Sequence, residues 1–272
     1  MSFDLGWALV LELLLLGACT GFLAGLFGIG GGMLLVPFMT FVLSARGMPA
    51  QLVVKMAIAT SLATICFTSM ASVRAHHRHG AVRWDIVRKL APGIVLGSLL
   101  GAQIAKAMPT HVLSVLFAVF ITFSATQMLR GRKPVPTREL PSAAPLFGVG
   151  SVIGLLAALV GAGGAFVSVP FMSWCNVKMH SAVATSAALG FPIAVAGTVG
   201  YVIAGWSLPN MPGGAVGFIY LPALVTISLA SVLTAPLGAG AAHRLNVAQL
   251  KRAFAVLLYA LAVYMAIKAA HL

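Results

Sequence analysis

Acidic side chains are almost absent from this 272-residue sequence, which contains four Asp and Glu residues in total. All charged residues together make up 8% of the chain, against about a quarter in ordinary soluble domains. A soluble protein of this length cannot cover its surface with so few charges, which excludes a soluble enzyme, a disordered chain and a secreted disulfide scaffold. Because 60% of the residues are hydrophobic and the mean hydropathy is +1.04, membrane spans are the useful unit of analysis.

Cysteine is also scarce. Cys19, Cys66 and Cys175 each lie in an apolar run and form no C-x-x-C pair, so we interpret them as small buried hydrophobes. The histidine-rich stretch 74–79 contains two arginines, which oppose a cation, and no Cys or acid, so a charged loop is favoured over a metal site. The sequence therefore predicts no metal site and no cofactor.

The net charge of +13 does not indicate nucleic-acid binding. The 17 Lys and Arg residues lie in short stretches between apolar runs, as the positive-inside rule expects of a membrane protein. No basic stripe follows a polar helix, and no RNA-binding motif is found. The predicted partners are a lipid bilayer and a small substrate, without nucleic acid, and no pattern indicates an oligomeric state.

Two of the eight apolar segments are too long for one membrane crossing. The segments are 6–43, 50–73, 86–105, 111–129, 143–175, 181–204, 215–242 and 247–267. A helix over 6–43 would be roughly 57 Å long, about twice the hydrocarbon core of a bilayer. The other six have lengths suited to single helical crossings.

Both long segments contain a glycine cluster, at 28–32 and 161–165. Glycine disfavours the interior of a helix and permits left-handed backbone. Pro37 and Pro170 follow and restrict where a helix continues. Each long segment is therefore predicted to be a helix, a glycine elbow and a shorter helix that starts near residue 33 or 166, or at the proline.

The two halves of the chain repeat. A shift of 133 residues aligns 17–39 with 150–172, with 12 of 23 positions identical. A shift of 125 aligns the Ala-Thr-Ser triplet at 59–61 with that at 184–186. The predicted organisation is a first transmembrane repeat at 1–129, a cytoplasmic linker at 130–142 and a second transmembrane repeat at 143–272.

The basic residues favour one topology. If each elbow segment is a hairpin that enters and leaves on one side, the Lys and Arg residues divide 13 to 4 between the two sides; if each segment crosses once, they divide 10 to 7. The positive-inside rule therefore favours hairpins, inverted halves, an outside N-terminus and cytoplasmic loops at 74–89, 130–142 and 243–252 in an inner membrane. The predicted fold is an all-α polytopic membrane protein, with each repeat a broken-helix hairpin plus three transmembrane helices.

The elbows are the strongest candidate for a site. Irregular backbone in a bilayer is tolerated where it is buried or lines a cavity, and transporters place substrates at such broken helices. The amides at the start of the shorter helix, with the positive end of the helix dipole, suit a small anion. The alternative is that the glycines only allow close helix packing. The candidate glycines are Gly28, Gly30, Gly31, Gly32, Gly161, Gly163 and Gly164.

Neutral hydroxyls and one amide form a second group of candidates. Thr60-Ser61 and Thr185-Ser186 occupy matching places in the two repeats and can donate hydrogen bonds to an anion. The alternative is hydrogen bonding between helices or to the preceding turn. Gln103 lies in an apolar span and can also donate, but its counterpart in the repeat is a proline.

Three ionisable residues are candidates for entrances or coupling. Lys55 and His180 match in the repeat and precede the Thr-Ser pairs, where they can attract anions, although interfacial anchoring explains them equally well. Glu12 is the one acid well inside an apolar segment, which makes proton coupling a hypothesis. Its place near the start of the predicted helix favours an interfacial position instead.

The paired motifs resemble the TauE/SafE sulfite exporter family, also called the toluene-sulfonate uptake permease family. The motifs are G-L-F-G-I-G-G-G-M-L-L-V-P at 25–37 and A-L-V-G-A-G-G-A-F-V-S-V-P at 158–170. The resemblance implies a prokaryotic inner-membrane permease that moves sulfite, sulfonates or related small organic anions, often outward. It also implies a substrate near Gly28, Gly30, Gly31, Gly163 and Gly164. Ala165 stands where the first repeat has Gly32, so a tighter second elbow is expected.

The predicted function is a secondary transporter, not an enzyme, that moves a small sulfur oxyanion or organosulfonate by alternating access. The rival functions are an anion channel, or a permease for another small anion such as a carboxylate. No nucleophile–base pair lies within the predicted spans, which makes an intramembrane enzyme remote.

Overall fold

The structure, a computed structural model, describes residues 7–27, 31–78, 80–130, 139–208, 211–242 and 247–271. It is almost entirely helical, and eight of the helices in these ranges are long and apolar enough to cross a membrane. The predicted all-α polytopic fold is therefore confirmed. The elements are α1 (Trp7–Phe27), α2 (Gly32–Ala45), α3 (Ala50–Arg78), α4 (Trp84–Ala107), α5 (Thr110–Arg130), α6 (Ala143–Val160), α7 (Ala165–Trp174), α8 (Met179–Gly205), β1 (Ala215–Val216), β2 (Ile219–Tyr220), α9 (Leu221–Ala242) and α10 (Val247–Ala270).

Both long apolar segments break at the predicted glycines. Gly31 and Gly164 precede α2 and α7 with φ of 67° and 72°, a left-handed conformation that costs glycine little. The two prolines do not mark the helix starts, because each is the sixth residue of its short helix. The order of a long helix, a short helix and three long helices therefore occurs twice along the chain.

Two sequence-based expectations were wrong. The apolar segment 215–242 is not one helix, because residues 215–220 form an antiparallel hairpin in which Ala215 pairs with Tyr220. Gly214 and Gly217, with φ of 81° and 56°, supply the turns. Cys19 is exposed and Cys66 is half-buried, so only Cys175 is the buried hydrophobe that was expected. An apolar residue on a spanning helix is stable when it faces lipid, so apolarity alone did not determine burial.

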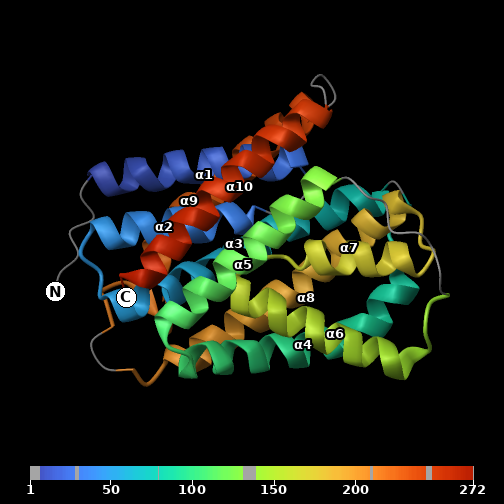
Figure 1. Cartoon of the computed structure of the whole chain (residues 1–272), viewed down its shortest axis with the longest axis horizontal. Coiled ribbons are helices and arrows are strands. Elements are labelled where there is room, and N and C mark those ends of the chain that lie inside the picture. The colour runs from blue at the N-terminus through green and yellow to red at the C-terminus, as the bar shows by residue number, and fades with distance from the viewer. Residues whose placement is uncertain are drawn as a thin grey trace.

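The helices pair across the two halves of the chain (Figure 1): α1 packs against α9, α6 against α4, α3 against α8 and α5 against α10. Glycines permit the closest of these approaches. A Cβ added to Gly17 in α1 would lie 2.7 Å from the carbonyl oxygen of Ile227 in α9, and one added to Gly150 in α6 would overlap the carbonyl oxygen of Leu90 in α4. The matching pairs place equivalent helices in equivalent surroundings.

Polar contacts show which helix ends lie together. The Arg46 guanidinium, just after α2, pairs with the Glu12 carboxylate near the start of α1 at 2.8 Å. Lys55 Nζ near the start of α3 donates to the carbonyl oxygen of Lys106 at the end of α4 at 2.8 Å. The first helix pair thus leaves one end of the bundle and returns to it. That end is on the left in Figure 1, where α10 also finishes.

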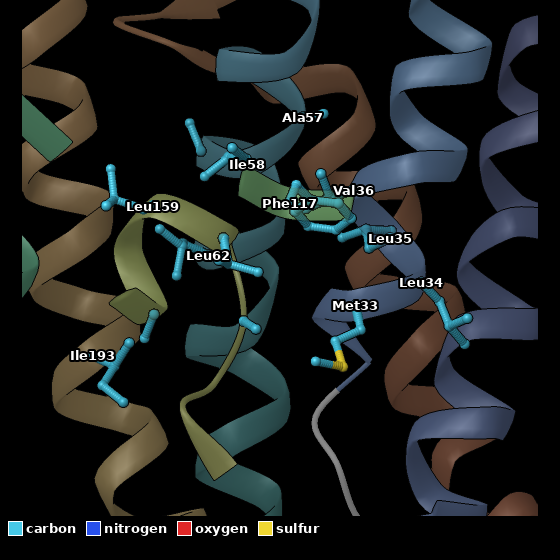
Figure 2. Close-up of a cluster of buried hydrophobic side chains, with 14 of the residues drawn as sticks. Met33, Leu34, Leu35, Val36, Ala57, Ile58, Leu62, Phe117, Leu159 and Ile193 are labelled. Atoms are coloured by element: carbon cyan, nitrogen blue, oxygen red, sulfur yellow. The ribbon is translucent and has the colours of Figure 1, made fainter. Parts of the chain in front are cut away.

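The core lies where α3 and α8 cross beside the two elbows. Figure 2 shows Met33 and Val36 of α2 on the side of Ile58 and Leu62 of α3, with Leu34 pointing away from them and Ile193 of α8 beyond Leu62. Leu35, Ile58, Leu62 and Ile193 are buried. These buried apolar side chains pack around the backbone of the elbows.

Candidate functional site

The two elbows meet at the centre of the bundle. A Cβ added to Gly32, the first residue of α2, would lie 2.5 Å from the carbonyl oxygen of Gly161 and 3.2 Å from Cα of Ala162. No side chain fits between these backbones. The second elbow also touches both crossing helices, because a Cβ on Gly161 would lie 3.1 Å from Cα of Ile58 in α3, and one on Gly164 would lie 2.6 Å from Ile193 in α8.

Each short helix begins at an elbow, and no described side chain caps its N-terminus. The first hydrogen bonds into α2 run from the amides of Leu34 and Leu35 to the carbonyl oxygen of Gly31, at 3.1 Å each. In α7 the amides of Val167 and Ser168 donate to the carbonyl oxygen of Gly164. The amides that precede these bonds point out of the helix end and carry the positive pole of the helix dipole. This arrangement can hold a small anion without a cationic side chain.

Gly28 and Gly30 lie outside the described residues. Of the candidate glycines, Gly32 and Gly161 lie in contact, while Gly31 packs against Ala24 and Gly164 against Ile193. Gly163 lies between α3 and α8, since a Cβ on it would be 4.0 Å from Ile65 and its carbonyl oxygen would be 3.7 Å from a Cβ on Gly190. Their contact with a substrate stays a prediction.

The two serines bind the second elbow unit. Ser61 Oγ in α3 donates to the carbonyl oxygen of Gly161 at 2.9 Å. Ser186 Oγ in α8 shares a hydrogen bond of 2.7 Å with Ser168 Oγ in α7. All three hydroxyls are buried, so these bonds satisfy groups that water does not reach. The serines therefore fix the backbone of the elbow, whether or not they also touch a substrate.

The two threonines have equivalent partners. Thr60 Oγ1 in α3 accepts the amide of Tyr220, the residue before α9, at 3.1 Å. Thr185 Oγ1 in α8 accepts the amide of Arg83, the residue before α4, at 3.0 Å. Each threonine thus anchors the start of a helix in the other half of the chain: Thr60 of α3 anchors α9, and Thr185 of α8 anchors α4. The hydroxyl hydrogen is not used in these bonds, so donation to an anion remains chemically open.

Gln103 lies away from the elbows. Its Nε2 donates to the carbonyl oxygen of Gly200 in α8 at 3.1 Å. Gly200 is ten residues beyond Gly190, which is about 15 Å along the helix. In this conformation Gln103 joins α4 to α8 and does not line the elbow.

The ionisable candidates lie at the ends of the bundle. Lys55 donates to the last turn of α4, where a cation stabilises the negative end of the helix dipole. His180 is exposed in the first turn of α8, and Thr185 in the next turn binds the residue before α4, so this helix start lies at the other end of α4 from Lys55. The Glu12 side chain is 47% exposed and paired with Arg46. These positions fit interfacial residues, and a role in entrances or coupling stays a prediction.

Basic residues gather at the end opposite Arg46. Among them, Arg83 pairs with Asp85 at 2.7 Å, and this hydrogen bond raises the pKa of the Arg83 guanidinium, which stays charged. His77 Nδ1 accepts a hydrogen bond from Trp84 Nε1, which joins the end of α3 to the start of α4. This use of His77 gives part of the histidine-rich stretch a structural role.

Sequence reasoning missed Tyr201. This fully buried tyrosine of α8 donates from its hydroxyl to the carbonyl oxygen of Ala158, in the last turn of α6, at 3.1 Å. It therefore fixes the helix end that leads into the second elbow. A tyrosine within an otherwise small-residue and apolar span was the available signal, since a buried hydroxyl requires a partner.

Comparison with known proteins gives one family. The family described as Sulfite exporter TauE/SafE matches residues 13–265. A relative from Haemophilus influenzae, named "Probable membrane transporter protein", is 36% identical over 261 residues, which cover 95% of this chain and 98% of the relative. Relatives with similar names are 27% identical in Methanocaldococcus jannaschii, over 83% of this chain and 81% of the relative, and 28% identical in Bacillus subtilis, over 74% and 83%. No solved structure matches the chain.

Proposed function

The chain belongs to the TauE/SafE sulfite exporter family, and we propose that it is a secondary transporter for a small sulfur oxyanion or an organosulfonate, such as sulfite. The observation that carries this proposal is the contact of Gly32, at the start of α2, with the carbonyl oxygen of Gly161 in the second elbow, together with the N-terminus of a short helix in each elbow. Helix N-termini in an apolar core favour a compact oxyanion.

The pairing of the helices supports alternating access as the transport cycle. In the proposed alternating access, the α3–α8 crossing is the pivot and the elbow is exposed to each side of the membrane in turn. The close fit of Gly32 against Gly161 favours a carrier over an open channel, because a continuous pore requires space at that point.

We propose the inverted arrangement of the two repeats as part of this function. The return of α2 to the end where α1 begins, fixed by the Glu12–Arg46 pair, supports the hairpin reading of the elbow segments. With elbow segments that are hairpins, the basic residues divide 13 to 4, which favours a cytoplasmic position for the end opposite Arg46. Proton coupling remains a hypothesis, and the substrate's own protonation would suffice for it.

A permease for another small anion, such as a carboxylate, is the second candidate. The elbow is made mainly of backbone, and backbone amides bind any compact oxyanion. A binding assay in which these anions compete with one another can identify the substrate, whereas the fold alone cannot.

The direct test is sulfite binding and counterflow in proteoliposomes. We expect exchange by the wild type and its loss in Gly31→Leu and Gly164→Leu. Gly47→Leu is the matched control, because Gly47 has the same left-handed backbone, with φ of 72°, but a Cβ there meets nothing within 4 Å. Sulfonates, sulfate and acetate are tested as competitors. If another of these anions exchanges and sulfite does not, the assignment of sulfite as the substrate is wrong. If no anion binds, the glycines only allow close packing of the helices.

A further inference from the structure

The hairpin of residues 215–220 packs against the end of α8. Phe218, Ile219 and Tyr220 are 1%, 4% and 0% exposed, although they belong to a connection between spanning helices. The hairpin backbone presses on the end of α8, because a Cβ on Gly205 would lie 2.6 Å from the amide nitrogen of Phe218. This connection is therefore packed as part of the core.

Helix α3 joins the hairpin to the elbow through two consecutive residues. Thr60 accepts the amide of Tyr220 at 3.1 Å, and Ser61 donates to the carbonyl oxygen of Gly161 at 2.9 Å. A displacement of the elbow that moves α3 at Ser61 also reaches the hairpin at Thr60.

Tyr201 makes a second connection, through α8. Its hydroxyl donates to the carbonyl oxygen of Ala158 at 3.1 Å, three residues before Gly161. Its ring meets the ring of Phe218 edge to face, with centroids 6.1 Å apart and planes at 85°. One buried side chain thus contacts the helix end of the elbow with its hydroxyl and the hairpin with its ring.

The loop at 80–83, which precedes α4, holds the place in the first half of the chain that the hairpin holds before α9. Its contacts differ from those of the hairpin. Thr185 holds the amide of Arg83, but Ser186 binds Ser168 of α7. The loop at 80–83 buries Ala81 and Val82 and exposes Arg83. The buried Phe218 ring and its contact with Tyr201 therefore distinguish the hairpin from the loop at 80–83.

We propose that residues 211–220 are the gate at this end of the transport path, and that Tyr201 is the positioning residue that couples the gate to the elbow. This inference rests on the proposed transport function for its role in turnover. A movement of the elbow that withdraws the Ala158 carbonyl leaves the Tyr201 hydroxyl without its partner in an apolar site, which favours a shift of the ring. The shift removes the contact that holds Phe218, and the hairpin opens.

The first test follows water access below the hairpin. The three native cysteines are replaced, and Ala63→Cys is introduced as a reporter, because Ala63 is buried one turn beyond Thr60 on the same face of α3, on the side away from Lys55. A membrane-impermeant thiosulfonate reagent is added from the hairpin side. We expect slow modification in the otherwise wild-type protein and at least about tenfold faster modification with Phe218→Ala. Phe218→Leu, which keeps an apolar side chain, serves if Phe218→Ala does not fold.

The second test asks whether Tyr201 couples the hairpin to the elbow. Tyr201→Phe keeps the ring and removes the bond to Ala158, so sulfite binding is expected to stay within about twofold of wild type while counterflow falls at least about tenfold. Sulfite is also expected to change the modification rate of the Cys reporter in wild type and not in Tyr201→Phe. Tyr259→Phe is the control, because it removes a half-buried Tyr hydrogen bond to Thr126 between α5 and α10, away from the elbow.

The outcomes separate the two proposals. Equal reporter modification in wild type and in the folded Phe218 variants overturns the gate, even if sulfite is transported. Equal counterflow by Tyr201→Phe and Tyr259→Phe overturns the role of Tyr201. Failure of the wild type to bind or exchange any tested anion overturns the proposed function, while the ligand-free modification rates still decide whether the hairpin closes the path.

Discussion

Gly32→Ala is expected to destabilise the protein, although alanine favours a helix more than glycine does. The added Cβ would lie 2.5 Å from the Gly161 carbonyl oxygen, whereas ordinary contacts begin at 3.4 Å, so the two elbows must separate by about 0.9 Å. Overpacking of this kind costs about 1–3 kcal/mol. Helix propensity alone predicts a gain of up to about 1 kcal/mol, so the two arguments differ in sign.

Gly148→Ala in α6 is the matched control. Gly148 is exposed, and a Cβ there meets nothing within 4 Å. Only the higher helix propensity of alanine then affects the free energy of unfolding, which should stay equal or rise. The measurements are thermal unfolding of both purified variants in one detergent and the initial rate of sulfite counterflow. We expect a lower unfolding temperature and slower counterflow for Gly32→Ala only. A Gly32→Ala protein as stable and active as Gly148→Ala would refute the approach of the two elbows.

Three further predictions concern the anchors and the ends of the bundle. Thr60→Val leaves the buried Tyr220 amide without its acceptor, so thermal unfolding should show a loss of about 1–3 kcal/mol that Thr60→Ser largely restores; an unchanged Thr60→Val would contradict this bond. Glu12→Gln should change stability by less than about 1 kcal/mol, because its ion pair is half-exposed, and should leave flux under an imposed pH gradient unaltered; loss of the gradient response would make Glu12 a coupling residue. In a cysteine-free background, an impermeant reagent should label Ser207→Cys in intact cells and Glu139→Cys only after permeabilisation, and the reverse pattern would invert the proposed orientation.

The breaks in the long helices were predictable because their cause is local. A run of glycines within a segment too long for one crossing requires an interruption, and α2 and α7 begin within one residue of the predicted start. The left-handed backbone at Gly31 and Gly164 follows from the same local chemistry. The helical spans likewise follow from the length of each apolar run.

The hairpin at 215–220 was not predictable from apolarity. Phe218, Ile219 and Tyr220 continue the hydrophobic run of α9, and a short apolar run does not distinguish a strand from the start of a helix. The hydrogen-bond partners of Thr60 and Ser61 could not be predicted either, because they lie 160 and 100 residues away in the chain. Local patterns identified the polar residues inside the spans, and only the packing of the two halves decided what each one contacts.

The surroundings of the second elbow explain why its backbone, and not its side chains, is the candidate recognition surface. The side chains that a Cβ on these glycines would meet are apolar, among them Val36, Ile65 and Ile193. Strong binding by a buried cation would slow release, whereas helix-end amides offer partial charges that a transported anion exchanges readily for water. Selectivity in such a site depends on the space between the elbows, which the contact of Gly32 with Gly161 already limits. Compact oxyanions should therefore compete better than bulky sulfonates, and the hairpin held by Tyr201 would govern when that space opens.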